Sequence, residues 1–296
     1  MRFKQHLNFL WHYLKNEDVA NIPLSTEDKK YVEYYCKIKK PVEISQHTGI
    51  SHVPLFKTTG SSYDFHRIIP LKDPVRFKYR WGDLTIPPDQ PTFVKNRKIL
   101  ESEGTSVLLP LNTGRNYFQI NDTKPFTQKH RQALWRGSAF KVWRKEFLKA
   151  VEHLSNINAK DTQPVKKGMF SKVGRPNYMS IREQLNYQFL ISIEGNDAAT
   201  NIKWILQSNS VLMMPRPRFE TWFCEGLLEP GRHFIEFKPD YSDINDVFEN
   251  YASRPKLCQE IINEAKEFSS FFFPIEKQFA IAREVVRKYK DLTTPL

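Results

Sequence analysis

Residues 187–215 read YQFLISIEGNDAATNIKWILQSNSVLMMP, and this stretch decides the fold class. It opens with a short apolar run at 189–193, which has the length of a buried strand, and the polar residues at 194–197 interrupt it. From Ala198 onward the apolar residues follow helical spacing, and a second apolar run follows at 211–214. The order strand, turn, helix, strand is typical of a βαβ unit with two parallel strands.

A ligand of such a unit binds beyond the carboxyl end of the strand, near the helix N-terminus. Free N–H groups and the helix dipole favour phosphate there. We therefore predict that residues 194–201 border the pocket of a phosphate-bearing ligand. On the pattern alone, a purely structural βαβ unit without a ligand is an equal alternative.

The composition indicates a folded, basic protein. The chain has 296 residues, of which 40% are apolar and 14% aromatic, which suits one large or two medium domains. Its 45 lysines and arginines exceed its 33 acidic residues, so the net charge is +12. This charge favours an anionic partner such as nucleic acid, an acidic membrane surface or a phosphorylated small molecule. A generally basic protein without such a partner is the alternative.

Cysteine usage and hydropathy favour a cytoplasmic location. Three cysteines far apart, Cys36, Cys224 and Cys258, fit neither a disulfide framework nor a zinc site, and they indicate a reducing compartment. We expect no signal peptide and no transmembrane span. Residues 2–15 show the spacing of an amphipathic helix, which either packs on the domain or lies on a membrane surface.

Two further strand ends carry polar residues. Residues 75–81 alternate between apolar and basic side chains, which predicts a strand that stops at Gly82. Asp83 then stands at a carboxyl strand end, where the site residues of α/β sheets gather. A turn aspartate that binds its own backbone is the alternative.

The second strand end follows a predicted strand at 133–135 and precedes a predicted helix at 140–154. The turn between them carries a cation, a glycine and a hydroxyl in Arg136, Gly137 and Ser138. Together with Arg144 and backbone N–H groups, this turn can hold a diphosphate.

Strands and helices alternate through the second half of the chain. Residues 155–180 are predicted as a polar loop, 219–225 as a helix and 234–237 as a strand. Helices are predicted at 244–251, 255–268 and 279–289. This alternation indicates an α/β protein with a largely parallel sheet.

Several function classes are excluded by missing motifs. The chain lacks G-x-G-x-x-G, the P-loop, H-E-x-x-H, G-x-S-x-G and a D-x-D triplet, and its eight histidines show no ligand spacing. We therefore expect no cofactor and no dedicated metal site. The basic residues are spread along the chain, which argues against a nucleic-acid partner.

Three segments resemble glycosyltransferase family 90: LWRGSAFKVWR, YQFLISIEGNDAATNIKWILQSNSVLMMPRPRFETWF and EPGRHFIEFKPDYSDI. This family includes Rumi-type protein O-glucosyltransferases and capsule xylosyltransferases. The resemblance covers roughly residues 75–270 and is greatest to the bacterial lipopolysaccharide-modifying branch.

The resemblance implies a GT-B fold, in which two Rossmann-like domains face each other across a cleft. The expected domains are residues 1–130, which bind the acceptor and carry the base, and 131–272, which bind the donor. Residues 273–296 form a C-terminal helix that packs back on the first domain. The implied reaction is an inverting, metal-independent transfer from a UDP-sugar to a saccharide acceptor. The implied acceptor is lipopolysaccharide core or another surface glycan, reached in peripheral contact with the inner face of the cytoplasmic membrane.

Site residues follow from the resemblance position by position. Asp83 matches the aspartate that serves as general base, and Arg136, Gly137, Ser138 and Arg144 match the diphosphate-binding segment. The expected donor-binding loop and helix comprise Glu194, Gly195, Asn196, Asp197, Ala198, Ala199, Thr200, Asn201 and Lys203. Lys95, Arg97 and Arg115 are expected either to grip an anionic acceptor or to form a solvated basic surface.

Two departures from the eukaryotic members leave the identity of the transferred sugar undecided. Arginines of those members are replaced here by Ala139 and Asn201. Two other functions also remain open: a non-catalytic basic protein that binds nucleic acid or an anionic membrane, and a family member that binds nucleotide but transfers nothing.

Overall fold

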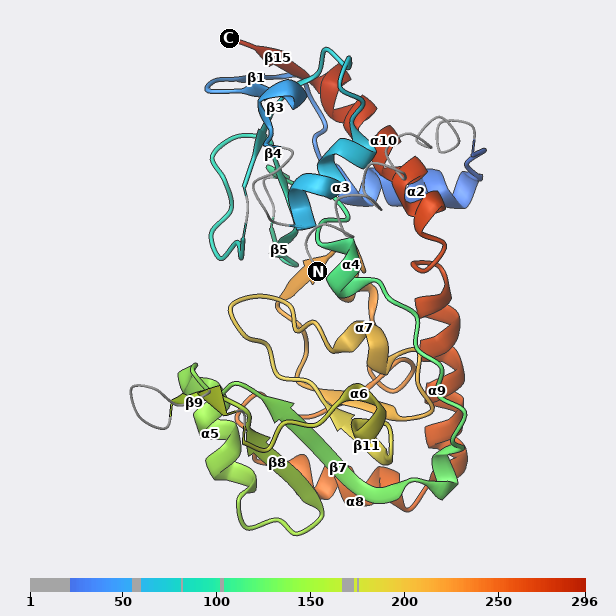
Figure 1. Ribbon diagram of the computed structural model, residues 1–296. Coiled ribbons are helices and arrows are strands. Elements are labelled where there is room, and N and C mark those ends of the chain that lie inside the picture. Colours follow the sequence, from blue (N-terminus) through green and yellow to red (C-terminus); the bar gives the residue numbers. More distant parts are fainter. Residues whose placement is uncertain (1–21, 55–59, 81, 102–103, 167–172, 175) are drawn as a thin grey trace.

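The computed structural model describes residues 22–54, 60–80, 82–101, 104–166, 173–174 and 176–296. The predicted helix at 2–15 lies outside these residues. Two sheets occupy opposite ends of an elongated molecule, and two successive helices, α9 (Pro255–Ser270) and α10 (Ile275–Leu292), run along its side (Figure 1). The parallel sheets with helices packed on them confirm the predicted α/β class.

The larger sheet has five strands in the order β14-β12-β11-β7-β8, and all neighbouring pairs are parallel. The strands are β7 (His130–Gly137), β8 (Ile157–Asp161), β11 (Tyr187–Ile191), β12 (Val211–Met214) and β14 (Ile235–Glu236). The helices that follow or pack on them are α5 (Val142–Val151), α7 (Ile202–Ile205), α8 (Ile244–Ala252) and α9 (Pro255–Ser270). The predicted βαβ unit is therefore present as β11, α7 and β12.

Both faces of this sheet are buried, which explains its nearly continuous apolar strands. Leu190 and Leu212 lie side by side in the register and join one core cluster. Phe189 and Val211 lie on the opposite face and join a second cluster, which includes side chains of α5, α8 and α9. The period-two alternation of each strand thus divides its side chains between two cores.

The smaller sheet has four strands in the order β2-β3-β4-β6. They are β2 (Thr48–Gly49), β3 (Arg76–Tyr79), β4 (Thr92–Val94) and β6 (Ser106–Leu108). The pairs β3–β4 and β4–β6 are parallel, and β2–β3 is antiparallel. An aromatic cluster of Phe65 from α3 (Gly60–Ile68), Phe77, Phe93 and Tyr289 from α10 (Ile275–Leu292) covers this sheet.

Two short ladders connect distant parts of the chain. Antiparallel pairing of β5 (Asn96–Lys98) with β13 (Phe219–Thr221) joins the regions of the two sheets. Parallel pairing of β1 (Val42–Ile44) with β15 (Thr293–Pro295) brings the end of the chain back to its beginning. Helix α10 packs beside α2 (Thr26–Tyr35), where Lys288 donates to Glu33 and to the Cys36 carbonyl.

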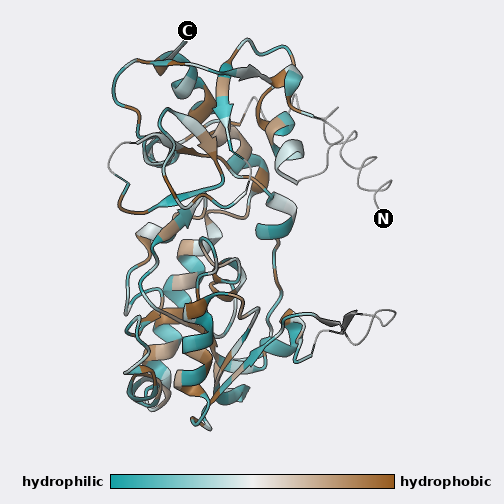
Figure 2. Cartoon of the chain, turned by 90° about the vertical axis from the view of Figure 1, so that its left-hand side faces the viewer, coloured by the Kyte–Doolittle hydropathy of each residue, from teal (hydrophilic) through white to brown (hydrophobic). Residues whose placement is uncertain are grey.

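The remaining elements are short. They are η2 (Ile50–His52), α4 (Thr113–Asn116), η3 (Phe126–Gln128), β9 (Val165–Lys166), β10 (Val173–Gly174), α6 (Ile181–Gln184) and η4 (Glu225–Leu227). Strands β9 and β10 pair in antiparallel fashion on an arm that projects from the body (Figure 2). Hydrophilic and hydrophobic residues alternate along the helices (Figure 2), and none of the described helices has the length and apolar character to cross a bilayer.

Three sequence expectations are wrong. The helix predicted at 219–225 is strand β13 followed by η4, because residues 219–221 pair with β5. The helix expected from Ala198 is a single turn, α7, and β11 ends at Ile191 rather than at 193. The polar loop predicted at 155–180 contains strand β8, which pairs with β7 on one side only and so tolerates polar residues.

Candidate active site

Four side chains from the two sheet regions meet at one point. Asp83 lies in the turn after β3, where Gly82 takes a φ of +87° that favours glycine. Lys95 directly follows β4, and Asn196 and Asp197 follow β11. The carboxyl ends of parallel strands from both sheets therefore converge here, as in other α/β ligand sites.

An ammonium group lies between two carboxylates in this cluster. The Lys95 Nζ is 2.5 Å from the Asp83 Oδ1 and 3.0 Å from the Asp197 Oδ2. Asn196 Nδ2 donates to the other oxygen of Asp83 at 2.8 Å. The contact between Asp83 and Asn196 joins the predicted base to the predicted donor loop, which we define as residues 194–201.

The two carboxylates respond differently to this environment. Partial burial opposes ionisation of Asp83, but hydrogen bonds from Lys95 and Asn196 outweigh it and lower the pKa of this carboxyl. Burial raises the pKa of Asp197, and the nearby Asp83 charge adds to that effect despite the attraction of Lys95. Asp83 is therefore the carboxylate that stays ionised most readily.

The start of the donor loop is fixed by α5. Trp143 Nε1 and Arg144 Nε both donate to the Glu194 carbonyl, at 2.8 and 3.1 Å. The same guanidinium donates to the carbonyls of Ile193 and Ser138, so it ties the turn after β7 to the turn after β11. A Cβ on Gly195 would lie 3.3 Å from Arg144, so a larger residue would crowd this junction.

The predicted diphosphate turn at 136–138 is only partly a turn, because Arg136 and Gly137 are the last residues of β7 and pair with β8. The Arg136 cation faces away from the donor loop. Arg136 donates to the carbonyl and the amide oxygen of Asn158 on β8. Gly137 is required for another reason, because a Cβ there would meet the Trp135 ring at 2.6 Å. The structure brings Ser138 and Arg144 to the donor loop and leaves Arg136 at the β8 side.

The later residues of the donor loop have internal partners. Ala198 and Ala199 are buried and Thr200 is exposed. Asn201 accepts from the Ser192 hydroxyl and donates to the Ile191 carbonyl, so its side chain braces the loop. Lys203 is buried against Glu225 at 3.0 Å, so this cation does not line the open part of the site.

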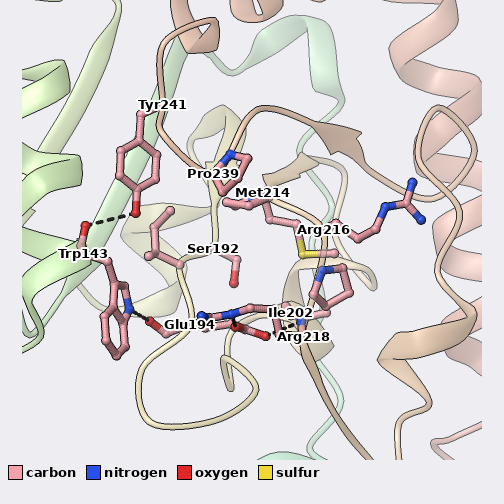
Figure 3. Close-up of a pocket in the computed structure, with 12 residues that line it drawn as sticks. Trp143, Ser192, Glu194, Ile202, Met214, Arg216, Arg218, Pro239 and Tyr241 are labelled. Atoms are coloured by element: carbon pink, nitrogen blue, oxygen red, sulfur yellow. Dashed lines mark hydrogen bonds and ion pairs between the residues drawn. The ribbon is translucent and has the colours of Figure 1, made fainter. Parts of the chain in front are cut away.

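A pocket of about 150 Å³ lies beyond the carboxyl ends of β11, β12 and β14. Trp143 and Tyr241 form one side, where the Tyr241 hydroxyl donates to the Trp143 carbonyl at 3.0 Å (Figure 3). Glu194 borders the pocket and accepts from the Arg218 side chain and backbone, each at 2.8 Å. Arg216 borders the opposite side (Figure 3), and its guanidinium pairs with Glu236.

Sequence reasoning missed most residues of this pocket. Glu194 alone among the predicted donor-binding residues lines it. Arg216 and Arg218 directly follow strand β12, in the segment PRPR. The strand-end argument that selected Asp83 would have selected these arginines as well. Trp143 and Tyr241 gave no such signal, because aromatic residues in or before helices are ordinarily core residues.

The three residues expected on the acceptor side have different surroundings. Lys95 belongs to the Asp83 cluster. Arg115 is exposed on α4, and its charge helps to lower the pKa of Asp83. Arg97 is fully buried, pairs with Glu220 at 2.7 Å and donates to backbone carbonyls of α2 and β6. Its placement therefore does not support an acceptor contact. Across the described residues, no three His, Cys, Asp or Glu side chains are grouped to hold a metal ion.

Strand-end loops of two sheets meet at a carboxylate, and a pocket lies at the strand ends of the larger sheet. This arrangement suits an enzyme that joins two bound substrates. A model of the glycosyl transferase family 90 matches residues 109–294. The chain is also 34% identical over 268 residues to the O-glucosyltransferase LpsA of Dichelobacter nodosus. That match covers 89% of this chain and 83% of the relative.

A shorter match links the chain to the uncharacterized protein 035R of Invertebrate iridescent virus 3. It has 25% identity over 92 residues, which is 30% of this chain and 8% of that protein. The chain belongs to glycosyltransferase family 90. The predicted family and the predicted enzyme class, a glycosyltransferase, are confirmed.

Proposed function

We propose that this glycosyltransferase moves a glucosyl group from UDP-glucose to a saccharide acceptor, with inversion at the anomeric carbon and without a metal ion. The choice of glucose rests on the relative that is an O-glucosyltransferase. The choice of lipopolysaccharide core as acceptor rests on the resemblance to the bacterial branch of the family. The proposal includes a GT-B arrangement, with acceptor and donor domains that meet at the Asp83 cluster.

The observation that carries this proposal is the contact between Asp83 and the donor loop. Asp83 Oδ2 accepts from Asn196 at 2.8 Å, although 113 residues separate the two in sequence. A base must lie within hydrogen-bond reach of the acceptor hydroxyl, and the acceptor must lie beside the bound donor. The position of this carboxylate against the donor loop supports the proposal that Asp83 is the base.

In the proposed step, Asp83 takes the proton of the acceptor hydroxyl as its oxygen bonds to the anomeric carbon. The bond from that carbon to the β-phosphate oxygen breaks, and UDP leaves with the additional negative charge. Arg216 and Arg218 are more than half exposed at the pocket mouth and can offset that charge. These two cations support the proposal of a reaction without a metal ion. That proposal is tested by measuring transfer in excess EDTA, where the rate should be undiminished.

The pocket beside Trp143 suits the nucleobase. A cavity of roughly 150 Å³ accommodates one aromatic ring, and this pocket has about that volume. Glu194 lines this pocket, so a base bound here would lie at one end of the donor loop. The sugar then extends along residues 195–197 toward Asp83, in keeping with the residues predicted from the family.

Replacement of the base tests the mechanism. Asp83→Asn should lower the transfer rate by about 10²–10⁴-fold, while UDP affinity, measured by calorimetry, stays near the wild-type value. Asp89→Asn is the matched control, because its carboxylate lies in the same loop region and is 83% exposed. Substantial turnover by Asp83→Asn would sink the assignment of the base.

The sugar donor can be identified from the melting temperature of the protein in the presence of different UDP-sugars. UDP-glucose and UDP should raise the melting temperature by mass action, and UDP-galactose and UDP-xylose should raise it less. Duplex binding with steep salt dependence and no response to UDP would instead favour a nucleic-acid protein. Stabilisation by UDP without hydrolysis or transfer of any UDP-sugar would indicate a family member that only binds nucleotide.

A further inference from the structure

Lys95 contacts two carboxylates, Asp83 and Asp197, and the proposed transfer step gives this lysine no role. Its side chain is only 20% exposed, and its ammonium lies between a carboxylate of the smaller sheet and a carboxylate of the donor loop. Both contacts, at 2.5 and 3.0 Å, are close enough for the ammonium to donate a hydrogen bond to each carboxylate. A lysine that serves only as a surface grip for the acceptor would not be expected to have both of these partners.

The other charged groups around this cluster are few. Arg115 on α4 acts on Asp83 through its charge, and Lys203 on α7 acts on Asp197 in the same way. Within the described part of the chain, neither cation forms a hydrogen bond or ion pair with these carboxylates, and Lys203 is paired with Glu225 instead. Lys95 is therefore the cation in direct contact with Asp83 among the described residues.

The geometry leaves Asp83 able to accept a proton. A carboxylate has about four acceptor sites on its two oxygens. Lys95 occupies one site on Oδ1 and Asn196 occupies one on Oδ2. Sites on both oxygens thus remain for an acceptor hydroxyl, while the two existing bonds fix the plane of the carboxylate.

We propose that Lys95 is a positioning residue, which holds the Asp83 carboxylate ionised and fixed against the donor loop, with Asp197 as its own anchor. The inference rests on the proposed function, because it assigns Lys95 to the base of that reaction. It differs from an acceptor grip, which would act on acceptor affinity and not on the ionisation of Asp83.

The pH profile of kcat/KM separates the two roles. In Lys95→Met, Asp83 loses its cation, so the acid limb should move to higher pH by at least about one pH unit. Lys95→Arg keeps the charge and should leave the limb near its wild-type position. In Asp197→Asn, Lys95 keeps Asp83 as its only carboxylate partner in this cluster. The acid limb of this variant should therefore not move to higher pH. A raised acceptor KM with an unmoved limb in Lys95→Met would overturn the inference.

A second measurement is independent of transfer. Titration of ¹³C-labelled aspartate carboxyls by NMR, with the Asp83 signal assigned from Asp83→Asn, reports the pKa of Asp83 directly. The same upward shift is expected in Lys95→Met, and its absence overturns the inference even if the variant is inactive. If the wild type transfers no sugar but Asp83 titrates as described, the proposed function fails and the ion-pair geometry stands.

Discussion

Asp64 shows how strongly one residue can depend on its surroundings. Its carboxylate is buried on α3 and accepts from the Thr113 backbone at 2.9 Å and from the Thr113 hydroxyl at 2.6 Å. Burial outweighs these bonds and raises the pKa of Asp64 to about 6 from an ordinary 3.8. At neutral pH the folded protein therefore carries an ionised, desolvated carboxylate.

This carboxylate predicts a pH-dependent stability. Because the folded pKa is the higher one, the stabilising effect of protonation is complete below about 3.8 and is lost as the pH rises through about 6. Between pH 7 and pH 5 the wild type should gain about 1 kcal/mol relative to Asp64→Asn. Urea denaturation of both proteins at the two pH values measures this gain. Asp89→Asn should follow the wild type, and identical profiles for wild type and Asp64→Asn would contradict the prediction.

Neighbouring cations of the same sequence cluster have different roles. Lys95 precedes β5 and reaches the donor loop, whereas Arg97 lies within β5 and points into the core. The sequence shows a basic cluster at 95–98 but cannot reveal that Arg97 meets Glu220, which lies 123 residues away. Burial of a charge depends on its partner, and the partner is set by the tertiary fold.

At the scale of elements, the last residue of β7 shows why a glycine is needed there. Gly137 belongs to the segment that the sequence predicts to hold a diphosphate. In the structure the nearest group to its missing Cβ is the ring of Trp135, which is itself buried. A side chain at this position would force the ring out of a packed core, independently of any ligand.

Two alanine substitutions test this. Gly137→Ala should destabilise the protein by about 1–3 kcal/mol through overpacking. Gly114→Ala is the matched control, because nothing lies within 4 Å of the added Cβ and the residue is in helix α4. It should change stability by no more than about 1 kcal/mol, in the stabilising direction. Equal effects of the two changes in urea denaturation would rule out the steric explanation.

Most strongly patterned elements were predictable. The apolar runs gave β11 and β12, and helical spacing gave α5, α8, α9 and α10 within a few residues. Elements decided by partners were not predictable. Residues 219–221 form a strand because they pair with β5, and this short segment alone fits a strand or a helix equally well.

At the scale of the whole molecule, a buried ion pair lies in the β5–β13 ladder that joins the regions of the two sheets. Arg97 on β5 pairs with Glu220 on β13, and the same guanidinium donates to the Tyr34 and Tyr35 carbonyls of α2. The Tyr34 hydroxyl also donates to Glu220. Both charges are completely buried, so each depends on the other for compensation.

Removal of this cation should weaken the whole fold. Arg97→Met leaves the Glu220 carboxylate buried without its counter-ion, which should cost about 3–5 kcal/mol in the free energy of unfolding. Arg131→Met removes a half-exposed surface pair with Glu249 and should cost no more than about 1 kcal/mol. Similar urea midpoints for the two variants would contradict the assigned role of the buried pair.

The candidate site, like the fold, was only partly predictable from the sequence. The strand-end argument selected Asp83 and the donor loop separately, and the structure places them in contact. It did not reveal which cations face the pocket, since Arg136 and Lys203 are turned toward Asn158 and Glu225. The direction of a long side chain depends on the partners that folding brings near it.

The indole of Trp143 gives this protein a built-in optical reporter. It lines the pocket and donates to the Glu194 carbonyl, whereas Trp135, Trp204 and Trp222 are buried away from the lining. A ligand in the pocket would change the polarity around this ring, so the intrinsic fluorescence of the unlabelled protein should report occupancy. The loss of that signal in Trp143→Phe would assign it, and donor affinity could then be measured before any acceptor is known.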